Sequence, residues 1–155
     1  VYKRQVKQAS EFAGTVPVRH LLPYWKTSNR YLFSGGSVNM RDAAVYAKEE
    51  NWSKAVELWK QTYETKKGKQ KMYAAYNTAL GYEMQDSIDT ALEWALKAQT
   101  LAREKSKTDK KETGEIHDGT ISYYIFISMY VDELEKRKEG MARLNMQMNR
   151  FDDDF

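Results

Sequence analysis

The sequence predicts an all-α fold, and three observations support this prediction. The phrase NWSKAVELW at residues 51–59 returns as SIDTALEWA at 87–95, which places Ala55 and Ala91 thirty-six positions apart. Internal repeats with periods of 20 to 50 residues are typical of stacked supersecondary units. Apolar residues recur at helical spacing over most of the chain. We therefore expect two helical hairpins, flanked by N-terminal helices, a short extended segment and a long C-terminal capping helix.

Length and composition favour one domain of ordinary globular type. It has 155 residues, 41% hydrophobic and 30% charged, with a net charge of +3. No cysteine is present, which excludes a disulfide framework, a thiol nucleophile and a Cys-ligated zinc site. Because the chain begins at Val1 without a methionine, we expect it to be a fragment of a longer protein whose targeting signal lies upstream.

The N-terminal segment, residues 1–36, is predicted to be helical and then extended. Helical spacing of Tyr2, Val6 and Phe12 predicts a first helix over 2–13. A second short helix would run over 15–23, with Pro17 in its first turn, where a missing amide donor costs nothing. Residues 30–33 have β-type composition, and a Ser/Gly joint follows at 34–37.

Residues 37–103 are predicted to form four helices in two pairs. The polar stretch 104–119 lacks the apolar side chains needed to pack on a core, so we expect a mobile loop there. Over 120–150 an apolar stripe with i, i+3, i+4, i+7 spacing predicts one long capping helix, with a bend at Gly140.

The two pairs resemble the tetratricopeptide repeat. Small residues at Ala43, Ala55, Ala79 and Ala91 would let paired helices approach closely, while bulky neighbours fill the gaps. The period is thirty-six, where that family has 34, and no proline ends the second helix of either pair, so the copies are degenerate. The bulky residues are Tyr46, Trp52, Trp59 and Tyr82.

The order PYWKTSNRYLF, SGGS, TALEWALKA is also similar to the C-terminal part of an uncharacterised lipoprotein family of Bacteroides-type Gram-negative bacteria. The resemblance implies a cell-envelope protein in the periplasm or at the outer membrane. It also implies membrane attachment only through a lipid anchor that this chain lacks.

Tetratricopeptide domains bind peptides along the face formed by the first helix of each pair, and the resemblance implies a protein or peptide partner here. The asparagine positions of the best-known peptide clamp are Ala44 and Leu80, so that clamp is absent. The first helix of the second pair is apolar on nearly every side, which is typical of a buried helix. We therefore weigh an open groove against one filled by the chain's own terminal helix. The candidate partner-binding residues are Met40, Ala44, Lys48, Tyr76, Leu80, Glu83 and Met84.

Tyr24, Trp25 and Tyr31 lie outside the repeats, and their rings suit stacking on sugars, so a glycan is a second candidate ligand. Trp52, Trp59 and Trp94 occupy helix-packing positions and are expected in the core. The basic cluster at 66–71 forms no continuous stripe, so we expect no nucleic-acid binding.

No catalytic grouping, cofactor site or metal site is expected. His20 and His117 are the only histidines, and neither has a partner at ligand-like spacing. We therefore expect a non-enzymatic interaction or scaffold module, with carbohydrate binding and a purely structural brace as alternatives.

Overall fold

The computed structural model describes residues 2–8, 24–113 and 123–153. These residues belong to two units, one comprising Val1–Tyr31 with Lys136–Phe155 and the other Leu32–Glu135.

The N-terminal segment contains an antiparallel strand pair, β1 (Tyr2–Gln8) and β2 (Tyr24–Arg30), in which Tyr2 pairs with Arg30 and Gln8 with Tyr24. The predicted helix over 2–13 is therefore wrong for residues 2–8. Its apolar positions Tyr2 and Val6 are four apart, a spacing that fits a period of 2 as well as one of 3.6. Pairing with β2, which the local pattern does not encode, decides between the two. Residues 9–13 and the predicted helix over 15–23 lie outside the described residues.

The extended segment predicted at 30–33 is also displaced. The strand occupies residues 24–30, and residues 31–33 continue from it without a strand partner.

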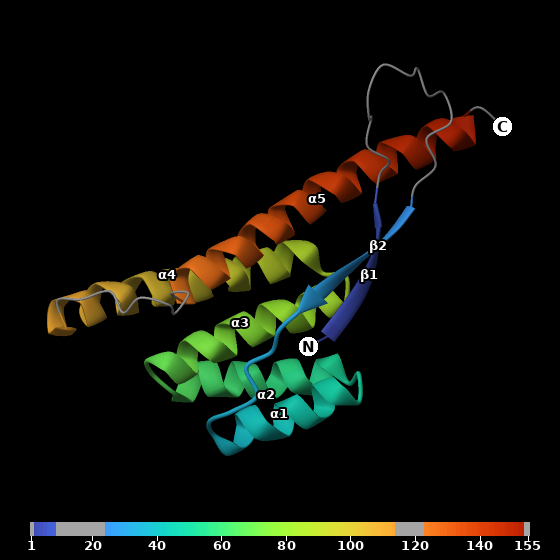
Figure 1. Cartoon of the computed structure of the whole chain (residues 1–155). Helices are drawn as coiled ribbons and strands as arrows, with labels where there is room; N and C mark the ends of the chain where they lie inside the picture. The colour runs from blue at the N-terminus through green and yellow to red at the C-terminus, as the bar shows by residue number, and fades with distance from the viewer. Residues whose placement is uncertain (1, 9–23, 114–122, 154–155) are drawn as a thin grey trace. The chain divides into compact units, whose positions relative to one another are not determined.

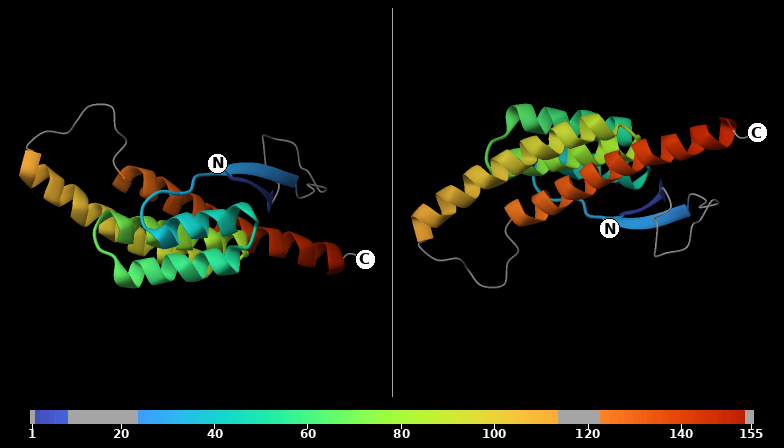
Figure 2. Two further views of the ribbon diagram at one scale, coloured as in Figure 1. Left: turned by 90° about the horizontal axis from the view of Figure 1, so that it is seen from below. Right: turned by 90° about the horizontal axis from the view of Figure 1, so that it is seen from above.

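Unit Leu32–Glu135 confirms the all-α prediction. It contains α1 (Val38–Lys48), α2 (Trp52–Thr65), α3 (Lys69–Met84), α4 (Ile88–Thr113) and the first part of α5 (Tyr123–Asp153). Helix α1 packs on α2, α2 on α3, and α3 on α4, in chain order (Figures 1 and 2). The two predicted hairpins are thus α1–α2 and α3–α4.

The turns that end α1 and α3 have the same geometry, thirty-six positions apart. Glu50 and Asp86 both occupy the left-handed region, with φ of 60° and 61°. In each turn the following amide donates to the carbonyl five residues back, at 2.8 Å and 2.9 Å respectively. This is a Schellman motif, which satisfies carbonyls that a helix end leaves unpaired. The donor and acceptor are Asn51 and Tyr46 in the first turn, and Ser87 and Tyr82 in the second.

Small residues bring the helices together. The repeat alanines are fully buried, and Gly81 of α3 lies directly against α2. A Cβ at Gly81 would overlap the Val56 side chain and lie 3.2 Å from the Trp59 ring. The absence of a side chain at Gly81 therefore permits the close contact between α2 and α3. The buried repeat alanines are Ala43, Ala55, Ala79 and Ala91.

The predicted mobile loop over 104–119 is wrong for residues 104–113, because α4 continues to Thr113. This stretch is rich in Lys and Glu, which have high helix propensity and can extend a helix that is already nucleated. Residues 114–119 lie outside the described ranges.

Helix α5 begins at Tyr123, close to the predicted start, and runs through Gly140 as a single helix to Asp153. In the part that belongs to the helical unit, Ile127 and Leu134 are fully buried and join the core formed by α3 and α4.

Candidate functional site: the inner face of helix α3

Helix α3 is buried on nearly every side. Ten of its residues are buried, and they include polar Asn77, Thr78 and Glu83. Its alanines admit neighbouring backbones and its tyrosines fill the remaining space, so this sequence forms a helix that neighbours surround. Two elements of the helical unit besides α2 and α4 cover it, namely α5 and the segment that contains Phe33.

The C-terminal half of α3 is covered by α5. The Tyr76 ring lies 5.4 Å from the Phe126 ring and 5.0 Å from the Tyr130 ring, measured between centroids. The Tyr130 hydroxyl donates to Glu83 Oε2 at 2.8 Å, and both side chains are buried. This hydrogen bond gives the buried Glu83 carboxyl group a polar partner. Helix α5 is therefore joined to α3 by packing and by polar contact.

The N-terminal half of α3 is covered by the segment between β2 and α1, which is neither helix nor strand. The Phe33 ring stacks on Tyr73, with centroids 4.2 Å apart and planes at 17°, and meets Tyr76 edge-on at 5.2 Å. The fully buried Asn77 side chain contacts both main-chain polar groups of Phe33. The Phe33 amide donates to Asn77 Oδ1 at 3.1 Å, and Asn77 Nδ2 donates to the Phe33 carbonyl at 2.7 Å.

Tyr73 and Tyr123 form the edge of this aromatic cluster. The Tyr73 hydroxyl donates to the Tyr123 hydroxyl at 2.7 Å. Burial raises the pKa of Tyr73 to about 12, with a further contribution from the hydrogen bond to Tyr123. On the exposed side, the Arg103 guanidinium donates to the Tyr124 hydroxyl at 3.3 Å and lowers the pKa of Tyr124.

The structure separates the predicted partner-binding residues into buried and accessible ones. Only Lys48 is fully exposed, while Ala44 and Met84 are half-buried. The expected groove is thus closed where α3 would line it. Of the two interpretations, an open groove and a groove filled by the chain's own terminal helix, the structure agrees with the second. The buried residues are Met40, Tyr76, Leu80 and Glu83.

Asn77 is the residue that the sequence interpretation missed. The family's clamp positions correspond to Ala44 and Leu80, whereas the asparagine that binds the main chain of Phe33 lies three residues before Leu80. The available signal was an isolated asparagine in the apolar run MYAAYNTALGY, since a polar side chain there needs partners.

A second group of side chains lies where α2, α3 and α4 meet, and it was also missed. Lys60 Nζ lies 5.0 Å from the centre of the Tyr82 ring and 5.9 Å from that of Trp94. Lys97 Nζ lies 4.1 Å from the Trp94 ring, which Tyr63 meets edge-on at 5.0 Å. Trp59 is fully buried, as expected, but Trp94 is only half-buried and serves this surface as well as the core.

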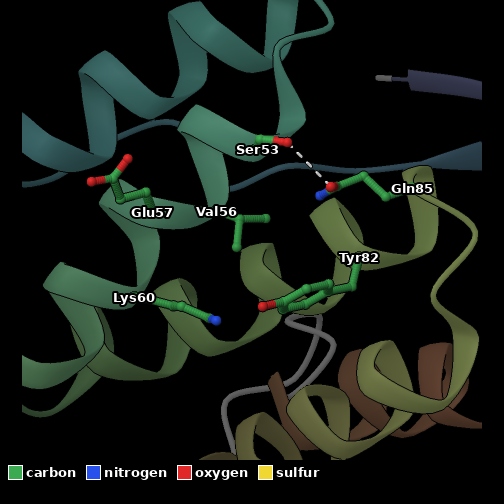
Figure 3. Close-up of a pocket in the computed structure, with 6 residues that line it drawn as sticks. All are labelled: Ser53, Val56, Glu57, Lys60, Tyr82 and Gln85. Carbon is green, nitrogen blue, oxygen red and sulfur yellow. Dashed lines mark hydrogen bonds between the residues drawn. The ribbon is translucent and has the colours of Figure 1, made fainter.

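Beside this group is an open hollow of about 320 Å³ between α2 and α3. In Figure 3 the Lys60 and Tyr82 side chains point toward each other across it, and the Ser53 hydroxyl donates to Gln85 Oε1 at 3.3 Å on its rim. The lining residues are Ser53, Val56, Glu57, Lys60, Tyr82 and Gln85.

The aromatic residues proposed for glycan stacking are on and after β2. Trp25 is 68% exposed and Tyr31 55% exposed. The side chain of Tyr24, like His20 and His117, lies outside the described residues.

Within the described ranges, no group of three or more His, Cys, Asp or Glu residues could hold a metal ion. None of the helices described is long and apolar enough to cross a bilayer.

Together these features define an all-α domain of helical hairpins whose central helix is enclosed by the chain itself. The chain belongs to the family described as Domain of unknown function (DUF6340), whose model matches residues 41–136. No curated protein and no solved structure matches the chain. Asn77 and the rings around it lie inside the matched residues, whereas Phe33 lies outside them.

Proposed function

We propose that the chain is a non-enzymatic scaffold and protein-interaction module of a larger cell-envelope lipoprotein, built from degenerate tetratricopeptide-like hairpins. The observation that carries this proposal is the enclosure of α3 by α5 and the Phe33 segment. A helical unit whose groove is filled by its own chain can support neighbouring parts of a larger protein. The envelope location and lipid anchor rest on the sequence resemblance stated above.

The accessible partner surface in this proposal is the outer face of α1. Val38 and Val45 are 60% and 56% exposed, and Arg41 and Lys48 are exposed beside them. The spacing 38, 41, 45, 48 places these residues on one helical face. Large exposed apolar side chains grouped with charged ones are typical of an interaction surface.

Native mass spectrometry of the full-length protein, released from envelope membranes in mild detergent, tests the proposal. The wild-type protein is expected to retain a stoichiometric protein partner, and Val45→Asp is expected to lose it while keeping its melting temperature. Glu57→Asp, an exposed change on α2, is the matched control. A protein recovered without a partner in every preparation contradicts the interaction role.

A second candidate function is glycan binding, which the exposure of Trp25 and Tyr31 favours. Amphipathic rings that remain in water at this level suit stacking on sugar faces. Titration of tryptophan fluorescence against a glycan panel tests it. A saturable change that Trp25→Ala abolishes supports the candidate, and a flat response across the panel removes it.

A further inference from the structure

We propose that Asn77 and the aromatic residues around it form a binding site for an extended peptide segment that carries a phenylalanine-like ring. Residues 32–34 of this chain, here called the strap, occupy the site in cis. A segment of a partner protein replaces the strap in the bound state. This inference rests on the proposed interaction function and names the chemistry of the partner.

The polar half of the site recognises main chain and not sequence. The Asn77 amide offers one acceptor and one donor, and these bind the amide and carbonyl of a single residue, Phe33, at 3.1 Å and 2.7 Å. Any residue in extended conformation, other than proline, presents the same pair of groups. Asn77 is fully buried with the strap in place, so these two hydrogen bonds take the place of bonds to water at its amide.

The apolar half of the site selects the side chain. The Phe33 ring is stacked on Tyr73 and lies 6.1 Å from Tyr123 and 6.0 Å from Phe126, both approached edge-on. Stacked and edge-on pairs of this kind add to the free energy gained from burial alone. A planar ring fits these contacts, whereas an aliphatic side chain reproduces only the burial.

The strap differs from α5 in how firmly the rest of the helical unit holds it. Phe33 is half-buried, and Ser34, Gly35 and Gly36 are exposed. A Cβ at Gly35 would have no neighbour within 4 Å, and Gly36 has a φ of +118°, which favours glycine. The joint therefore lets the strap leave without moving α1. By contrast, Ile127 and Leu134 of α5 are fully buried, so α5 stays in place.

The strap of the chain competes with a partner's segment for the same site. The apparent affinity of the site for the partner's segment therefore depends on how tightly the strap binds. An intramolecular segment competes at a high effective concentration, so the intact chain binds a trans segment weakly. A partner displaces the strap if its segment carries the same ring and makes further contacts with the chain.

Fluorescence anisotropy with a labelled peptide of sequence YLFSGGS, corresponding to residues 31–37, tests the inference on the full chain. The peptide is expected to bind Phe33→Ala at least about tenfold more tightly than wild type, because the cis competitor is weakened. A peptide with alanine in place of phenylalanine is expected not to bind. Adding Asn77→Leu to Phe33→Ala should weaken binding by about tenfold or more, since both main-chain hydrogen bonds are lost.

Circular dichroism and a melting curve establish folding of each variant. If Phe33→Ala does not fold, Phe33→Leu keeps an apolar side chain and loses the stacking. If neither folds alone, recovery of the melting transition on adding the peptide supports the site, and no recovery overturns it. A folded variant that binds both peptides equally, or neither, also overturns it. A wild-type dimer that Phe33→Ala dissociates would assign the site to a second copy and overturn the partner assignment.

The result is independent of the native mass spectrum. Peptide binding with no partner on the full-length protein would retain the site and remove the proposed function. If the full-length protein retains a partner but the chain does not bind the peptide, the proposed function is retained and the peptide site is removed.

Discussion

The two helical hairpins share their turns and differ in their burial. Thirty-six positions separate Ala44 from Leu80 and Val45 from Gly81. In the first hairpin these positions are half-buried and 56% exposed. In the second both are buried, and Gly81 touches α2. Residues at matching positions of the repeat therefore have the same backbone path. The side chain that each position requires depends instead on how many helices surround its hairpin.

The difference follows from the number of neighbours. Within the helical unit α1 packs on α2, whereas α3 contacts α2, α4, α5 and the strap. A helix with one neighbour needs one apolar face, and a helix with several needs small and apolar residues all round.

The substitution with the largest expected effect is Leu80→Gln, which places an amide among fully buried side chains. Lost apolar burial together with unpaired polar atoms should lower the free energy of unfolding by about 3 kcal/mol or more. Ala44→Gln, at the matching position of the first hairpin, should cost less than about 1 kcal/mol because its side chain can reach water. Urea denaturation of both variants measures the difference, and equal losses would mean that the two hairpins are equivalent.

The next largest effect is expected at the matched pair Gly81 and Val45. Gly81→Ala introduces a Cβ that overlaps Val56 and crowds Trp59, so it should cost about 1 to 3 kcal/mol despite the better helix propensity of alanine. Val45→Ala should change stability by less than about 0.5 kcal/mol, since the side chain is exposed. Thermal melts compare the two, and a stable Gly81→Ala would show that α2 and α3 do not approach as closely as described.

A smaller effect is expected at the two turns, where Glu50 and Asp86 have left-handed backbones. Glu50→Gly should raise stability by about 0.5 to 1 kcal/mol, because glycine adopts this conformation without a Cβ penalty. Asp86→Gly should gain less, since aspartate tolerates this region better than glutamate does. Chemical denaturation that shows a loss at Glu50→Gly would contradict the assigned turn geometry.

The sequence predicted the all-α class and the hairpin register because both depend on local signals. Repeated small residues and helical periodicity are patterns among residues close together in the sequence. The thirty-six-residue spacing of the repeat reappears in the hydrogen bonds of the two turns. The N-terminal strand was not predictable in this way. Tyr2 and Val6 fit two periods, and the choice depends on pairing with β2.

The candidate site was predicted only in outline. The apolar surround of α3 indicated burial, and covering by the terminal helix was one of two interpretations. The contact between Asn77 and Phe33 spans forty-four positions, and a hydrogen bond between such distant residues leaves no periodic trace. The same holds for Lys60 and Trp94, which only the packing of α2 near α4 brings together.

The smallest expected effect is a change in the pH dependence of stability. It distinguishes the two hairpins because Tyr73 can ionise, whereas Ser37, at the matching position of the first hairpin, cannot. The pKa of Tyr73 is raised from 10.0 to about 12 in the fold, chiefly by burial. Folding therefore favours the neutral phenol, and this contribution is complete below pH 10 and is lost as the pH rises through 12. Tyr73→Phe cannot ionise, so its melting temperature should fall less steeply than that of wild type between pH 10 and 12.

Tyr124→Phe is the control of opposite sign, because hydrogen bonding from Arg103 lowers the pKa of Tyr124 and the fold favours its ionised form. That variant should lose stability relative to wild type as the pH rises to about 10, and the difference should stay constant above that pH. Melting curves at half-unit steps from pH 9 to 12 separate the two slopes. Parallel curves for Tyr73→Phe and wild type would mean that water reaches the Tyr73 hydroxyl, and the Phe33 ring stacked on Tyr73 would then not exclude solvent from the end of α3.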